Sequence, residues 1–278
     1  MNTSVFGLQT KNQKIKMTYK TLLIEKKDQI ATLWFNRPDV RNAFNEAMIS
    51  EIIQAVEEIN ADEKIRILVL RGKGNAFCAG ADLNWMKDVA RYSRQQNLDE
   101  SLNLSLCFYT IYTCKKPTIS VVHGASIGGA NGLLAACDFA IAETKTIFSL
   151  SEVKIGIIPA CISPYVIKRV GEYTARELML TGRRFEGMEA KNHRLVNDAV
   201  AEKELNQALK DLTDSLLSSG PNALTMCKKL IQNVSNNWTL KEAYTKTAEM
   251  IADIRVSDEG QEGMAAFLEK RKPNWLNE

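Results

Sequence analysis

The chain has 278 residues and a mass of 31.1 kDa, which allows one large domain or a domain with an appendage. Apolar residues make up 45% and charged residues 25% of the sequence, a balance that excludes disorder as the main state. The formal net charge of +3 is too small for the basic surface of a dedicated nucleic-acid-binding protein.

The sequence carries no clear signal for a membrane, a metal or a disulfide. No apolar run reaches the ~18 residues that a membrane-spanning helix needs, and residues 1–20 resemble neither a secretory signal nor a transit peptide. We therefore expect a cytoplasmic protein in which residues 1–20 form a flexible extension. The six cysteines form no CxxC pair, and His123 and His193 lie far apart, so we expect free thiols and no metal site.

Short apolar runs and glycine-bearing loops organise the first two thirds of the chain. Apolar residues between Met48 and Ile59 recur with the spacing of one helical face. Two later strand-like runs each precede a glycine loop and a helical pattern, and such repeated units favour a layered α/β core. The predicted strands are residues 21–26, 30–36, 65–70, 118–122 and 138–142.

The last third of the chain has helical patterns and no predicted strands. No convincing strand is predicted from Thr174 onward, whereas helical patterns recur to the end. We therefore expect a core over residues 21–200 and a C-terminal helical subdomain, which would serve trimerisation, over residues 201–278. The predicted helices of this part are residues 175–180, 202–217, 222–234 and 240–254.

The glycine loops, residues 72–80 and 124–129, are the most informative local features. Glycine permits positive φ angles and close backbone approach to a ligand, and a helix that starts after such a loop presents unpaired N–H groups. Neither loop matches the dinucleotide-binding or the phosphate-binding glycine motif. Both a ligand-binding role and simple tight turns remain open on these residues alone.

Several motifs together resemble the enoyl-CoA hydratase/isomerase (crotonase) superfamily. Residues 77–83, FCAGADL, are similar to its FxAGADL signature, and residues 124–129, GASIGG, to its GxxxGG loop. Further matches in family order run from about Thr21 to the end of the chain, through LTG at 180–182 to EGM at 262–264. The resemblance implies a spiral of ββα units followed by C-terminal helices, with acyl-CoA as the substrate and no metal or redox cofactor.

Within the superfamily the sequence most resembles bacterial 3-methylglutaconyl-CoA hydratases. The residues that carry this likeness are 81–86 (ADLNWM), 150–153 (LSEV), 162–165 (ISPY) and 254–263 (IRVSDEGQEG). The implied reaction is hydration of 3-methylglutaconyl-CoA to 3-hydroxy-3-methylglutaryl-CoA, a step of leucine breakdown.

The resemblance also implies a catalytic site. The backbone amides of Ala81 and Gly129 would hold the thioester oxygen as an oxyanion hole, in which one donor is typically worth about 10²–10³ in rate. Glu152 would act as acid and base, its pKa raised by apolar surroundings. Without the resemblance, a surface ion pair would be the expected role of Glu152. Hydratases of the family commonly carry another glutamate where this chain has Gly132.

The missing glutamate leaves the reaction open. One glutamate can hydrate a double bond if a water molecule bridges it to the β-carbon. It can also move a proton between C2 and C4, as in Δ3,Δ2-enoyl-CoA isomerases. A third reading is a CoA-binding protein without turnover, and an RNA-binding role is disfavoured by the small net charge.

By resemblance, coenzyme A would lie against two backbone segments, with cationic side chains at its phosphates and a C-terminal lysine contributed by a neighbouring subunit. A homotrimer or dimer of trimers is the implied assembly, although ordinary solvated charge explains Lys270 equally well. The predicted CoA-binding residues are Arg41, Asn42, Ala43, Ala79, Gly80, Asp82, Leu83 and Lys270.

Four other residues with reactive side chains are assigned structural roles. We expect Asp82 to cap a helix and Cys161 to line the pocket, since no histidine is near it in sequence to activate its thiol. His123 and Asp138, at the ends of strand-like runs, are expected to be structural.

Overall fold

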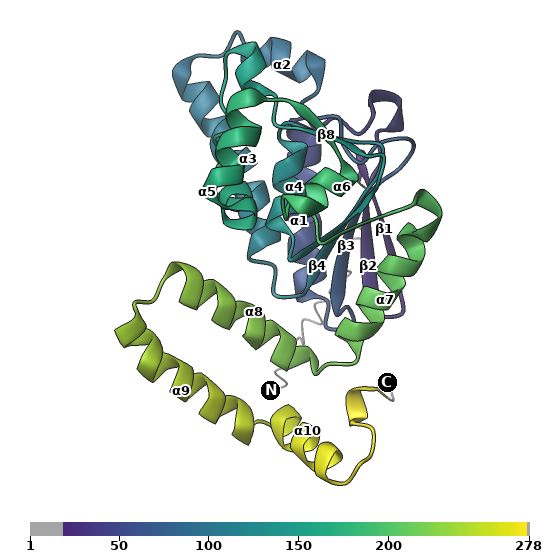
Figure 1. Cartoon of the computed structure of the whole chain (residues 1–278), viewed down its shortest axis with the longest axis vertical. Helices are drawn as coiled ribbons and strands as arrows, with labels where there is room; N and C mark the ends of the chain where they lie inside the picture. The colour runs from purple at the N-terminus through teal and green to yellow at the C-terminus, as the bar shows by residue number, and fades with distance from the viewer. Residues whose placement is uncertain (1–18, 277–278) are drawn as a thin grey trace, which may run out of the picture.

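The computed structural model describes residues 19–276 of the chain (Figure 1). A six-stranded sheet has the order β1-β2-β3-β4-β6-β9, and a three-stranded sheet has the order β5-β7-β8. The strands are β1 (Leu22–Lys27), β2 (Ile30–Phe35), β3 (Ile67–Gly72), β4 (Thr118–Val122), β5 (Ala125–Ile127), β6 (Phe139–Glu143), β7 (Ile147–Ser149), β8 (Arg184–Glu186) and β9 (Asp198–Val200).

The helices lie on the two faces of the large sheet, and the last three of the chain lie below it (Figure 1). Short 3-10 helices η1 (Pro38–Val40), η2 (Glu152–Ile155), η3 (Glu202–Glu204) and η4 (Asn274–Leu276) connect them. The α-helices are α1 (Glu46–Ala61), α2 (Leu83–Val89), α3 (Arg94–Tyr112), α4 (Ala130–Ala136), α5 (Ser163–Thr181), α6 (Gly187–Asn192), α7 (Leu205–Leu217), α8 (Pro221–Asn236), α9 (Leu240–Val256) and α10 (Asp258–Leu268).

Alternation along the central strands explains the two layers of helices. Leu68 and Leu70 of β3 belong to the large core cluster that also contains the buried faces of α1 and α3. Ile67 and Val69, which point to the opposite face, pack in a smaller cluster with Leu205 at the start of α7. Successive side chains of a strand point to opposite faces, so a strand that is covered on both sides is apolar throughout.

The sheet topology gathers the glycine loops at one edge. In the large sheet of residues 19–276, strands β2, β3, β4, β6 and β9 run parallel, and β1 is antiparallel to β2. The loops after β3 and β4 therefore leave the sheet at the same edge. This common edge brings together two loops that lie some fifty residues apart in the chain.

Most of the predicted elements are confirmed, and one prediction is wrong. The bounds of β4 are as expected, and the predicted apolar face of α1 is buried from Met48 to Ile59. Strands do occur after Thr174, because β8 pairs with β7 and β9 pairs with β6. Both have three residues, which is too short for a period of two to be recognised. Helix α10 was not predicted, nor were β5 and β7.

The chain ends in helices that lie apart from the sheet. In Figure 1, α8, α9 and α10 extend below the core, and neither α8 nor α9 has a buried residue. The division of the chain at residue 200 stays a prediction. The flexible extension predicted for residues 1–20 falls almost wholly outside the described residues. Tyr19, the first described residue, packs against α1 and donates a hydrogen bond to Glu58. No helix within residues 19–276 is both long and apolar enough to cross a bilayer.

Candidate active site

The two glycine loops converge beyond the edge of the large sheet. Cys78 and Ser126 form an isolated parallel bridge, in which the Cys78 amide donates to the Ala125 carbonyl at 3.1 Å and the Ile127 amide to the Cys78 carbonyl at 3.2 Å. Gly80 has a φ angle of +96°, and a Cβ there would lie 2.9 Å from the Ile127 carbonyl oxygen. Only glycine fits such a close approach without displacing the backbone.

Two backbone amides near this junction have no protein acceptor within residues 19–276. Ala81 bridges Phe44, but the bonds of that bridge use the amides of Phe44 and Asp82. The Ala81 amide therefore points to the other side of the segment. Gly129 is the N-cap residue of α4 and so carries one of the unpaired N–H groups of a helix start. Unpaired backbone amides are the donors from which an oxyanion hole is built.

Asp82 fixes the segment that carries the Ala81 amide. Its carboxylate caps α2 by accepting from the Asn84 and Trp85 amides, as predicted, and it pairs with Arg37 at 2.7 Å. Burial alone would raise the pKa of Asp82, but the Arg37 guanidinium and the two amides outweigh it and lower the pKa. The ionised side chain thus ties the start of α2 to the loop after β2.

Glu152 begins η2, in the loop after β7. One carboxylate oxygen, Oε2, is buried with no hydrogen-bond partner in the described part of the chain, and no lysine or arginine there forms an ion pair with it. Burial is the main cause that raises the pKa of Glu152, opposed by a bond from its own backbone amide. Of its apolar neighbours in the sequence, Leu150 is fully buried, whereas Ile155 is 60% exposed.

The carboxyl group of Glu152 lies beside the second glycine loop, residues 124–129, called the oxyanion loop below. A Cβ built on Gly128 would be 3.3 Å from Oε1 of Glu152, and Gly128 has a φ angle of +56°. Gly128 immediately precedes Gly129, so the acid and one unpaired amide are neighbours in space. The contacts of Gly80 with Ile127 and of Gly128 with Glu152 thus join the loops after β3, β5 and β7, which carry the predicted catalytic residues Ala81, Gly129 and Glu152.

A family model described as enoyl-CoA hydratase/isomerase matches residues 25–278. The chain belongs to this family.

Similar proteins agree with this assignment. A curated protein of Thermus thermophilus, named putative enoyl-CoA hydratase, is 33% identical over 249 residues, which cover 90% of this chain and 98% of that protein. A crotonyl-CoA hydratase of Syntrophomonas wolfei is 31% identical over 265 residues, covering 94% and 100%. The crystal structure of an enoyl-CoA hydratase from Shewanella pealeana matches with a TM-score of 0.88 at 41% identity, covering 92% and 96%. The chain has the crotonase fold.

No room exists for a side chain at Gly132, where hydratases of the family commonly carry another glutamate. A Cβ there would lie 2.3 Å from Cγ2 of Ile162 and 2.9 Å from the ring of Phe108. Ile162 and Phe108 are both buried in the large core cluster. Core packing thus occupies the volume that a side chain at Gly132 would need, and Glu152 is the acid that the described residues place beside the second glycine loop.

Aromatic side chains pack next to Gly129. A Cβ on Gly129 would lie 2.6 Å from the ring of Phe44, so a larger residue here would first displace that ring. Phe44 is in turn tilted against Trp85 with 5.8 Å between ring centroids. The indole N–H of Trp85 donates to Glu100, whose pKa burial raises.

The predicted CoA-binding residues near the junction differ in exposure. Arg41 is exposed, and its carbonyl accepts a bond from the Ala79 amide. Leu83, the first residue of α2, is 75% exposed. Ala43 and Asn42 are buried, and Asn42 holds the loop together through Arg37, Lys73 and Ala76. Lys270 follows α10, which Figure 1 places at the opposite end of the molecule from α2. This chain's own Lys270 therefore does not reach its own site.

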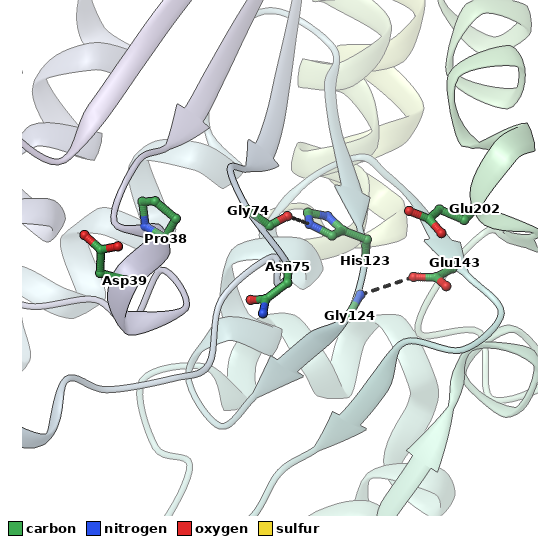
Figure 2. Close-up of a pocket in the computed structure, with 8 residues that line it drawn as sticks. All are labelled: Pro38, Asp39, Gly74, Asn75, His123, Gly124, Glu143 and Glu202. Atoms are coloured by element: carbon green, nitrogen blue, oxygen red, sulfur yellow. Dashed lines mark hydrogen bonds between the residues drawn. The ribbon is translucent and has the colours of Figure 1, made fainter.

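A separate hollow of about 550 Å³ lies at the carboxyl edge of the large sheet (Figure 2). His123 lines it and bonds the Gly74 carbonyl through Nε2 at 2.9 Å, which agrees with its predicted structural role. The hollow contains none of Ala81, Gly129 and Glu152. The complete lining is Pro38, Asp39, Gly74, Asn75, His123, Gly124, Glu143 and Glu202.

Other reactive side chains are satisfied elsewhere. The six cysteines are free, as expected, and Cys161 contacts the Ser101 carbonyl and the core. Glu177, Glu189 and His193 form a cluster of possible metal ligands in the described chain, but Arg183 donates hydrogen bonds to both carboxylates. A guanidinium therefore already fills the centre of this cluster.

Sequence reasoning missed the residues that hold the site from beneath. Phe44 and Ile162 approach Gly129 and Gly132 from other loops, so no local spacing could reveal them. Asn131 is fully buried in the first turn of α4. Its signal in the sequence was a single polar residue among glycines and alanines at a helix start.

Proposed function

We propose that the chain hydrates an α,β-unsaturated acyl-CoA thioester, with 3-methylglutaconyl-CoA as the substrate. Family membership supplies the general activity on acyl-CoA thioesters. The observation that carries the proposal is one buried carboxylate oxygen without a partner, on Glu152, next to the oxyanion loop. An unsatisfied polar atom of this kind costs about 1–3 kcal/mol, a cost that a catalytic role explains.

The proposed mechanism uses the two amides and one acid. The Ala81 and Gly129 amides bind the thioester oxygen, and the positive end of α4 favours the negative charge that grows there. Ionised Glu152 takes a proton from a water molecule as the water oxygen bonds to C3, and the π electrons move to the thioester oxygen. The enolate then takes the same proton from Glu152 at C2. The sum is one water added, and Glu152 returns to its starting state.

The raised pKa of Glu152 suits this double duty. A group that must accept and then donate a proton works best when its pKa is near the working pH. Burial moves the pKa of Glu152 upward, toward neutrality. The reaction as proposed needs no metal or redox cofactor, since coenzyme A is part of the substrate.

Isomerisation is the second candidate, and the packing around Gly132 favours it. A Δ3,Δ2-isomerase needs one acid to move a proton between C4 and C2, and here Ile162 and Phe108 leave no room for another. Incubation with 3-methylglutaconyl-CoA and with a 3-enoyl-CoA in H₂¹⁸O separates the reactions. We expect one ¹⁸O atom in the hydrated product. A product without label from both substrates would refute hydration, and tight binding without any turnover would indicate a CoA-binding protein.

The choice of 3-methylglutaconyl-CoA rests on subgroup motifs at residues 81–86, 150–153, 162–165 and 254–263. Contacts of residues in the first three motifs support the proposal: Trp85 packs on Phe44, whose ring meets Gly129, Glu152 approaches Gly128, and Ile162 fills the space at Gly132. A panel of crotonyl-, 3-methylcrotonyl- and 3-methylglutaconyl-CoA tests the assignment. We expect the highest kcat/KM for 3-methylglutaconyl-CoA, and a preference for the unbranched substrate would contradict it.

We further propose a homotrimer, or a dimer of trimers, assembled through the C-terminal helices. Leu240 is 90%, Val256 76% and Phe267 83% exposed, and large exposed apolar patches commonly mark contacts between proteins. In such an assembly Lys270 of one subunit could serve the site of another. Light scattering on the purified protein gives the mass, and a monomer would contradict this. A cytoplasmic location remains a prediction.

A further inference from the structure

Asn131 is a polar side chain in an apolar setting. It is the second residue of α4, is 0% exposed, and has buried neighbours throughout that helix. A buried side-chain amide is tolerated when its hydrogen-bonding groups find partners. The partners of Asn131 show what the side chain does.

All three hydrogen bonds of the Asn131 side chain are made with β5, β7 and the residue that follows β5. Its Nδ2 donates to the Gly128 carbonyl at 3.0 Å and to the Ser149 carbonyl at 2.9 Å, and its Oδ1 accepts from the Ser126 hydroxyl at 3.1 Å. Carbonyl oxygens can only accept, so the group between Gly128 and Ser149 must be the NH₂. Its orientation is thereby fixed.

The two carbonyls belong to the two halves of the catalytic apparatus. Gly128 precedes the oxyanion donor Gly129, whereas Ser149 ends β7, three residues before Glu152. Strands β5 and β7 pair up to Ile127 and Ser149, and one more bond, from the Gly128 amide to the Ser149 carbonyl at 2.8 Å, follows. Beyond it the chains diverge, one into α4 and the other into η2. Asn131 adds a further link at this fork.

We propose that Asn131 is a positioning residue that sets the distance between the Gly129 amide and the Glu152 carboxyl group. It touches neither the acid nor the expected thioester oxygen, and it acts by fixing the loops that carry them. This inference rests on the proposed function, because it assumes that these two groups act on one substrate. A displacement of about 1 Å in such a site can cost about 100-fold in rate.

The test compares Asn131→Leu with two controls. Leucine has a similar size and removes all three bonds. Ser126→Ala removes only the donor to Oδ1 and keeps both bonds of Nδ2. Thr118→Val removes another fully buried hydroxyl, at the start of β4, where Thr118 bonds Asp138 and not the site. The two controls separate loss of the bridge from loss of a buried polar group.

We expect Asn131→Leu to lower kcat about 10–100-fold while KM changes less than about threefold, because the amides and the CoA contacts remain. Thr118→Val should keep kcat within about threefold, even where the melting temperature falls, and Ser126→Ala should lower kcat less than Asn131→Leu does, because both bonds of Nδ2 remain. A kcat of Asn131→Leu equal to that of Thr118→Val would overturn the proposal.

A structural readout does not depend on the substrate. Crystal structures of the wild type and of Asn131→Leu should differ in the separation of the Gly129 amide and the Glu152 carboxyl group, and an unchanged separation would overturn the proposal even if no enoyl-CoA is turned over. A wild type without turnover, but with a separation that shifts in the variant, would instead refute only the proposed function.

Discussion

Replacing Glu152 by glutamine should nearly abolish turnover and leave substrate binding intact. Glutamine keeps the shape of the side chain but cannot carry the proton between water and C2. General acid–base catalysis typically contributes about 10²–10⁴ in rate, which corresponds to about 3–5 kcal/mol in activation free energy. KM should change little, since in the proposed mechanism the thioester oxygen is held by the Ala81 and Gly129 amides and not by this side chain.

The same variant should become more stable relative to the wild type as the pH rises. Burial raises the pKa of Glu152 in the folded state, while the unfolded chain keeps a value near the ordinary 4.5. Below the unfolded pKa the carboxyl group is neutral in both states and costs nothing extra. Between the two pKa values ionisation favours the unfolded chain, so the wild type loses stability with rising pH. Glutamine does not ionise, and the loss disappears.

Steady-state kinetics and thermal unfolding from about pH 4.5 to pH 8 test both statements. The melting temperature of Glu152→Gln minus that of the wild type should increase with pH. Glu63, an exposed residue, provides the matched control, because Glu63→Gln should leave both kcat and the pH trend unchanged. Wild-type kcat in Glu152→Gln, or a stability difference that falls as the pH rises, would refute the reasoning.

Three further substitutions test the packing of the site. Gly128→Ala places a Cβ at a φ angle of +56° and 3.3 Å from Glu152 Oε1; we expect a loss of about 1–2 kcal/mol in unfolding free energy and a lower kcat, and an unchanged kcat would argue against the contact. Gly132→Glu should destabilise the protein by at least ~1–3 kcal/mol without raising activity, whereas adding Ile162→Ala should restore part of the melting temperature. Arg37→Met leaves Asp82 ionised and unpaired; we expect a loss of up to about 3–5 kcal/mol that shrinks as the pH falls through the pKa of Asp82, and a pH-independent loss would contradict this.

Long elements and loop motifs could be predicted from the sequence because their signals are local. Helix α1 has a full apolar stripe with Asn45 as its cap, and β4 is an uninterrupted β-favouring run that is buried on both faces. The strands β5, β7, β8 and β9 have three residues each. Their pairing depends on partners elsewhere in the chain, so tertiary contacts and not propensity create them.

The candidate site divides in the same way. The oxyanion loops and Glu152 lie in recognisable motifs, and the Asp82 cap follows from its place before α2. The contacts that support them cross the chain: Ser149 lies 18 residues from Asn131, and Phe44 reaches Gly129 from the loop after β2. Lys270, which was predicted as a CoA ligand, follows α10, so its predicted role belongs to contacts between subunits and not to the fold of one chain.

The packing at Gly132 links the fold to the choice of mechanism. Where another glutamate would stand, Ile162 and Phe108 complete the core beneath α4, so a second acid could be gained only by emptying part of that core. On the proposed mechanism, the chemistry must then be one in which a single carboxyl group accepts and returns the same proton. Hydration and isomerisation both satisfy this condition and share an enolate held by the same amides. They differ in whether a water molecule reaches C3, so access of water to the space beside Glu152, and not the acid itself, decides between them.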